Sequence, residues 1–81
     1  MENKKIGYVW YVKMAYGRYM PEEVLYPTIE ELKAYQQAHY PYYYDACIGI
    51  DKVEDDGSWF ETIESIQKPT ECFFIHDSEN D

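Results

Sequence analysis

The sequence predicts a single small α+β domain in which one helix packs on a mainly antiparallel sheet. Three observations lead to this fold class. The chain has 81 residues, enough for one hydrophobic core, and it is 46% hydrophobic and 19% aromatic, as folded chains are. Short runs rich in β-branched and aromatic residues alternate with turn residues, and one segment has the start signal of an amphipathic helix. We expect the order ββαβββ over residues 1–76 and a disordered acidic tail over residues 77–81.

Two strands are expected before the helix. Residues 6–12, Ile-Gly-Tyr-Val-Trp-Tyr-Val, carry apolar side chains on both alternating faces, which is typical of a central strand covered on both sides. Gly17 indicates a turn, because glycine adopts positive φ without strain. Residues 24–26 are expected to form a short second strand, and Pro21 just before them favours an edge position.

The helix is expected from Thr28 to residue 39 or 40. Thr28 and Glu31 form a capping box, in which the Thr28 side chain accepts a hydrogen bond from the Glu31 amide. Pro41 ends the helix. The residues at three- and four-residue spacing that form one face are Ile29, Leu32, Tyr35 or Gln36, and His39.

A hairpin is expected after the helix. Residues 46–53 alternate as a strand, and Asp56-Gly57 is a strong signal for a two-residue turn. This turn predicts two apolar cross-strand pairs and one pair of opposite charge: Ile50 with Ile63, Val53 with Phe60, and Lys52 with Glu61.

A helix over residues 59–66 is the alternative to this hairpin. Ser58 and Glu61 also have capping-box spacing, and Phe60, Ile63 and Gln67 have helical spacing. We favour the hairpin because its three cross-strand pairs agree with one register. Residues 71–76 then give a last strand.

The charge of the chain is unevenly placed. The net charge is −9, and residues 42–81 contain eleven acids against only Lys52 and Lys68, whereas acids and bases cancel in the first half. This balance excludes direct binding to nucleic acid or to an anionic membrane, since both require a basic face. It favours a partner protein with a basic surface.

Catalytic and metal sites are not expected. Cys72 and His76 would share a strand face at a separation of about 13 Å, too far for a nucleophile and its base. The acids around Gly57 lack calcium-loop spacing, because Val53 would occupy the third ligand position of a loop that begins at Asp51. We therefore expect a binding protein without a cofactor, not an enzyme.

The segment Tyr40-Pro41-Tyr42-Tyr43-Tyr44 is the remaining candidate for contact with a partner. Successive side chains of an extended segment point in opposite directions, so one or two of these rings should be exposed. Exposed tyrosines are common at interfaces. The alternative is that the rings cap a thin core.

The small size and acidic charge resemble, in composition, the anti-restriction and anti-CRISPR inhibitors of phages and mobile elements. The resemblance implies a nucleic-acid mimic that occupies the cationic groove of a larger protein in the bacterial cytoplasm. The alternatives are a homodimer formed through the tyrosine face or a sheet edge, and a small-ligand regulatory domain. The two cysteines and the short apolar stretch after Lys5, which ends at Lys13, agree with a cytoplasmic protein without a secretory signal.

The candidate partner-binding surface lies on the predicted hairpin and its flanks. We expect Asp51 and Glu64 to share its exposed face, while Ile48, Ile50 and Ile63 face the core. The predicted surface consists of Asp45, Asp51, Glu54, Asp55, Asp56, Glu61 and Glu64, edged by Tyr42 or Tyr43.

Overall fold

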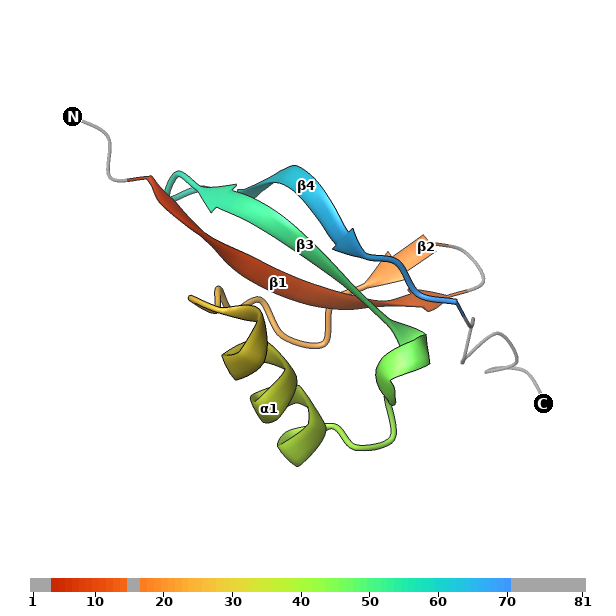
Figure 1. The fold of residues 1–81 in the computed structure, drawn as a ribbon. Helices are drawn as coiled ribbons and strands as arrows, with labels where there is room; N and C mark the ends of the chain where they lie inside the picture. The colour runs from red at the N-terminus through yellow and green to blue at the C-terminus, as the bar shows by residue number, and fades with distance from the viewer. Residues whose placement is uncertain (1–3, 15–16, 71–81) are drawn as a thin grey trace.

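The computed structural model describes residues 4–14 and 17–70. These residues form a four-stranded antiparallel sheet in the order β2-β1-β3-β4, with one α-helix against it (Figure 1). The predicted α+β class is therefore confirmed. The predicted last strand at residues 71–76 and the predicted tail at 77–81 lie outside the described residues. The elements are β1 (Lys5–Met14), β2 (Gly17–Tyr19), α1 (Ile29–His39), a 3₁₀ turn (Asp45–Cys47), β3 (Ile48–Asp55) and β4 (Phe60–Gln67).

β1 occupies the centre of the sheet, as its apolar pattern predicts. It pairs with β3 along one edge and with β2 at the end of the other. Trp10 and Val12 are fully buried on the face toward α1, and Val9 and Tyr11 are buried on the opposite face. Both faces of β1 are covered, although only one of them is covered by a helix.

The second strand lies at Gly17–Tyr19, so the predicted strand at residues 24–26 is wrong. Gly17 has a φ of +136°, which allows the chain to reverse before it reaches Pro21. Only Tyr26 of the predicted strand pairs with the sheet. It forms an isolated antiparallel bridge to Tyr8, with N···O distances of 2.8 and 2.9 Å.

The Glu22 carboxylate explains why residues 20–25 leave the sheet edge. Its Oε2 accepts hydrogen bonds from Trp10 Nε1 at 2.8 Å and from the Tyr26 hydroxyl at 2.6 Å. These bonds hold the segment against the helix-facing side of β1. Burial, and then the hydrogen bond to Glu22, raise the pKa of the Tyr26 hydroxyl well above its usual range.

The core lies between α1 and the sheet. Trp10 is at its centre, with the Tyr40 ring edge-on at a centroid distance of 5.2 Å and the Tyr43 ring at 5.8 Å. Gln36 is fully buried, and its Nε2 donates to the carbonyl oxygens of Tyr40 at 3.1 Å and Tyr43 at 2.6 Å. The end of α1 is thereby joined to the turn that follows it. Leu32, Ile48 and Ile50 complete the layer.

Thr28 caps the start of α1 as predicted. Thr28 has an extended backbone, and its Oγ1 accepts a hydrogen bond from the Glu31 amide at 3.1 Å. Helix α1 ends at His39, also as predicted. Thr28→Ala is expected to lower the free energy of unfolding by about 1 kcal/mol, because one amide of the first turn loses its acceptor. Urea denaturation measures the change, and a midpoint equal to that of the wild type would contradict a capping role.

β3 and β4 form a hairpin, so the alternative helix over residues 59–66 is wrong. The loop is longer than predicted, because Asp55 pairs with Phe60 and leaves residues 56–59 between the strands. The Asp55 carboxylate accepts from the Gly57 amide at 2.9 Å, and that of Asp56 accepts from the Ser58 amide at 2.9 Å. Hydrogen bonds from the backbone amides of Ser58 and Trp59 hold the pKa of the Asp56 carboxyl below its usual value.

The predicted cross-strand pairs are therefore wrong, although the strands are right. The structure forms none of the three predicted pairs, which were Ile50 with Ile63, Val53 with Phe60, and Lys52 with Glu61. β4 also contains two register shifts, and Ile63 and Ile66 are the extra residues at these bulges. The observed pairs include Val53↔Thr62, Lys52↔Glu64, Asp51↔Ser65 and Ile50↔Gln67.

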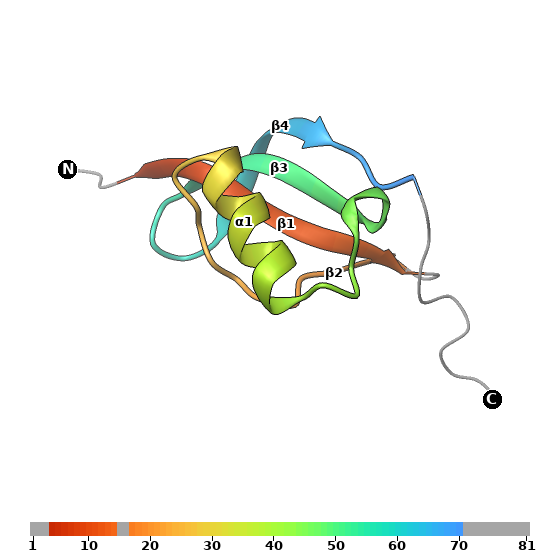
Figure 2. The same cartoon turned by 60° about the horizontal axis from the view of Figure 1, so that its bottom comes forward.

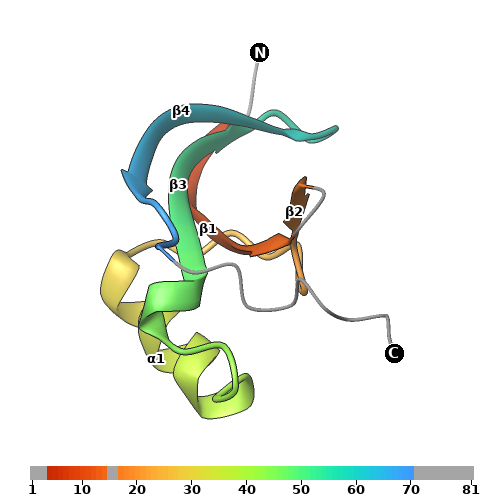
Figure 3. The same ribbon diagram turned by 90° about the vertical axis from the view of Figure 1, so that its right-hand side faces the viewer.

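The sheet is strongly curled, which creates two unlike faces. Figure 3 shows β4 and β2 rising on the side opposite α1, so that β1 and β3 form the bottom of a trough. Figure 2 shows α1 lying across β1 and β3 on the outer, convex side. Bulges increase local strand twist, so those in β4 contribute to this curl. The inner side of the trough is called the concave face below.

Candidate functional site

The floor of the concave face is built by a glycine opposite a tyrosine. Gly49 of β3 pairs with Tyr11 of β1, and a Cβ at position 49 would lie 2.6 Å from Tyr11 Cε1 and closer still to Cζ and the hydroxyl. The missing side chain allows the Tyr11 ring to lie across β3. Burial raises the pKa of the Tyr11 hydroxyl, and the nearby Arg18 charge partly offsets that effect.

Arg18 and Asp51 form an ion pair on this floor. Arg18 Nη1 lies 3.0 Å from Asp51 Oδ2, and the Arg18 guanidinium carbon lies 4.3 Å from the centre of the Tyr11 ring. The partners differ in exposure, with 61% of the Arg18 side chain accessible against 3% of the Asp51 side chain. Asp51 Oδ1 is buried and accepts no hydrogen bond from a described residue.

The ion pair lines a hollow of about 250 Å³ on the concave face. An adjoining hollow of about 420 Å³ extends toward the hairpin tip and shares Met20 and Phe60 with the first. The second hollow adds the carboxylates of Glu23 and Asp55. The other residues that line the first hollow are Val9, Tyr11, Val53 and Thr62.

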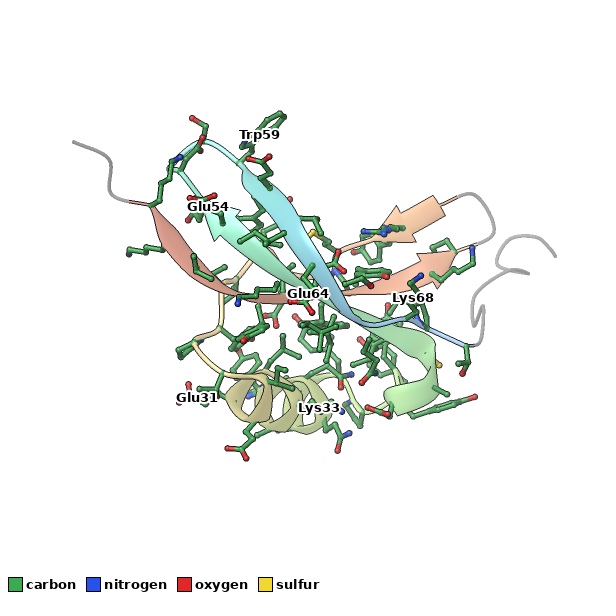
Figure 4. The ribbon with its side chains drawn as sticks, turned by 45° about the horizontal axis from the view of Figure 1, so that its top comes forward. Glu31, Lys33, Glu54, Trp59, Glu64 and Lys68 are labelled. Carbon is green, nitrogen blue, oxygen red and sulfur yellow. The ribbon has the colours of Figure 1, made fainter. Side chains whose placement is uncertain are left out.

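A second candidate surface runs along β4. Six of its eight residues are exposed, and among the described strands β4 forms the edge of the sheet. Ile63 and Ile66, at the bulges, are exposed. The Trp59 side chain at the hairpin tip is 68% exposed (Figure 4). We call Trp59, Glu61, Ile63, Glu64 and Ile66 the β4 surface.

The predicted acidic residues do not form one continuous surface. Asp51 and Glu64 were expected on one face. Glu64 pairs instead with Lys52. Asp51, the residue before Lys52 in β3, lies on the concave face and is buried. Ile48 and Ile50 face the core as predicted, whereas Ile63 is exposed.

The other predicted acids are mostly engaged in local contacts. Asp45 lies 3.4 Å from Lys33, and Glu54 lies 3.7 Å from Lys4. Asp55 and Asp56 accept hydrogen bonds from amides of their own loop. Within the described part of the chain, Glu61 and Glu64 are the two predicted acids that make neither an ion pair nor a hydrogen bond through their side chains.

The tyrosine segment is divided between core and surface. Tyr43 is buried against Trp10, whereas Tyr42 and Tyr44 are 56% and 48% exposed. The expectation that one or two of the rings are exposed is therefore confirmed. Of the two predicted edge residues, Tyr42 is the accessible one, and its ring packs on Tyr43 at a centroid distance of 4.6 Å.

Arg18 is the residue of the concave face that the sequence does not indicate. It is separated from Asp51 by 33 positions, and the two meet only because the sheet curls. A signal for Asp51 was present, since it lies between Gly49 and Val53 on one side of a largely apolar strand. A lone acid in such a strand is rarely buried without a cationic partner.

Neither a metal-binding cluster nor a membrane-spanning helix is found in residues 4–14 and 17–70. No group of three or more His, Cys, Asp or Glu side chains there is placed to hold a metal ion. None of the helices in this part of the chain is both long and apolar enough to cross a membrane.

Comparisons with models of protein families, with curated proteins and with solved structures found no match to this chain.

Proposed function

We propose that the protein binds and inhibits a larger protein by placing the β4 surface on a basic, nucleic-acid-binding groove of that partner. The observation that supports this most directly is the composition of the β4 surface. It combines two uncommitted carboxylates, Glu61 and Glu64, with the exposed apolar side chains of Trp59, Ile63 and Ile66. Interfaces pair an apolar centre with polar groups that select the partner.

The arrangement favours a basic partner over a second copy of the chain. Pairing β4 with β4 would bring the carboxylates of Glu61 and Glu64 close to their own copies, which is unfavourable. Bulges and charged side chains on an edge strand also oppose strand pairing. Contact through side chains with lysines and arginines satisfies the same carboxylates.

A displacement experiment tests this function. Proteins of a bacterial lysate are loaded on immobilised double-stranded DNA, washed, and eluted with the purified protein. We expect release of one or a few specific DNA-binding proteins, because the acidic surface competes with the phosphates for their basic groove. The released proteins are quantified by mass spectrometry at low and at high ionic strength.

A matched pair of variants makes the result specific to the β4 surface. Glu61→Gln with Glu64→Gln, and Glu30→Gln with Glu31→Gln, each remove two carboxylates, so both change the net charge from −9 to −7. The first variant should reduce release roughly tenfold, and the second should leave it nearly unchanged. Glu22 is unsuitable as a control because its carboxylate holds Trp10 and Tyr26. Absence of release, or equal losses in the two variants, would contradict the proposal.

A further inference from the structure

The Arg18–Asp51 pair is incomplete on the side of the buried carboxylate. A carboxylate and a guanidinium pair best through two parallel hydrogen bonds. Here Arg18 Nη1 contacts only Oδ2, at 3.0 Å, and Oδ1 is left without a partner among the described residues. Asp51 is therefore a buried anion whose Oδ1 can still accept a hydrogen bond.

The cationic member of the pair is the replaceable one. The Arg18 side chain is 61% exposed and comes from β2, a three-residue edge strand. Its guanidinium lies over the Tyr11 ring but fills only part of the hollow, of which about 250 Å³ remains. Another cation can thus take the position of the guanidinium on Asp51 and Tyr11 if Arg18 swings toward solvent.

The surroundings of the pair select the chemistry of that cation. Among the described residues, Asp51, Glu23 and Asp55 line the two adjoining hollows against one cationic residue, Arg18, so a positive charge is favoured. Val53, Phe60 and Tyr11 offer apolar and aromatic walls, which suit a flat or aliphatic body. The hollow at the ion pair has a volume of about 250 Å³, which is below the range of about 300–1,000 Å³ typical of drug-sized ligands, so a small group fits there.

We propose that the concave face binds a small guanidinium- or amidinium-type cation, which displaces Arg18 and donates to both oxygens of Asp51. Arg18 then acts as an internal occupant that competes with the ligand. The Arg18–Asp51 pair lies outside the β4 surface, which shares only Trp59 with the adjoining hollow, and the proposal does not depend on the function proposed for that surface.

Benzamidine is the first probe, with benzamide as its neutral isostere and benzoate as its anionic one. Each is titrated into the ¹⁵N-labelled full chain, and the amide signals are followed by NMR. We expect saturable shifts at the amides of Val9, Asp51 and Val53 with benzamidine, roughly tenfold weaker binding of benzamide, and no binding of benzoate. Equal affinities for benzamidine and benzamide would overturn the proposal.

Two variants separate a ligand site from a purely structural ion pair. Asp51→Asn should abolish binding of benzamidine. Arg18→Ala should increase the affinity several-fold, because it removes the internal competitor. Lys33→Ala is the control for the change in net charge, since Lys33 lies on α1 beyond the opposite face of the sheet (Figure 4), and it should have no effect. Weaker binding of benzamidine to Arg18→Ala would overturn the proposal even if Asp51→Asn does not fold.

The source of the cation is identified by one further titration. N-acetyl-arginine amide carries the same donor group on an aliphatic chain, as an arginine side chain of a partner protein does. Binding as tight as that of benzamidine assigns the site to such a side chain. Binding of benzamidine alone assigns it to a free aromatic cation. Failure of both cations would overturn the proposal without affecting the displacement test of the β4 surface.

Discussion

Trp10→Ala is expected to lower the free energy of unfolding by about 4 kcal/mol, the largest effect of any single substitution considered for this protein. The Trp10 side chain is fully buried between α1 and the sheet, in contact with the rings of Tyr40 and Tyr43. Its loss leaves a cavity and removes one of the two donors to Glu22. Because small domains have a total stability of about 5–15 kcal/mol, this loss would remove a large share of the stability of the fold.

Trp59→Ala is the matched control, since it is the same substitution at an exposed site. The Trp59 side chain is 68% exposed at the hairpin tip, so the change in free energy should stay within about 0.5 kcal/mol. Urea denaturation followed by circular dichroism measures both variants. Similar losses for the two substitutions would contradict the placement of the core around Trp10.

Gly49→Ala is expected to lower the free energy of unfolding by about 2–3 kcal/mol, at the upper end of the cost of overpacking. The added methyl group would overlap the Tyr11 ring, which is buried beneath Arg18. The same denaturation assay measures the loss.

A double-mutant cycle identifies Tyr11 as the cause of this loss. In a Tyr11→Ala background the methyl group meets no ring, so Gly49→Ala should then cost less than about 0.5 kcal/mol. A cost that stays the same in both backgrounds would mean that Gly49 is required for its backbone and not for the space above it.

Helix α1 was predictable because its signals are local. The α1 boundaries depend on Thr28, Glu31 and Pro41, which act within a few positions of themselves. The hairpin was predictable for the same reason. Its register was not, because the side chains of Asp55 and Asp56 stabilise a longer loop than Asp56-Gly57 alone would form.

The concave face was not predictable, because it depends on how distant segments are placed in three dimensions. Asp51 does lie opposite the core-facing Ile48 and Ile50, as expected, but Arg18 covers it there, and the bulges in β4 give Glu64 a different partner from the expected one. Its partner Arg18 lies on β2, where the sequence indicates only a turn at Gly17. Charge counts along a chain cannot distinguish a solvated carboxylate from one buried beneath an arginine.

The pairing of β1 with β3 determines when the sheet can form during protein synthesis. Every β1–β3 pair joins residues on opposite sides of α1, from Val12↔Ile48 to Lys5↔Asp55. While the ribosome is still translating α1, β1 has only the short β2 beside it, and the apolar side chains of Trp10 and Val12 lack the strand that completes their core. Non-local pairing of this kind folds slowly and leaves apolar surface open to wrong contacts. Trp10 and Val12 therefore remain without their partner strand until residue 55 has left the exit tunnel.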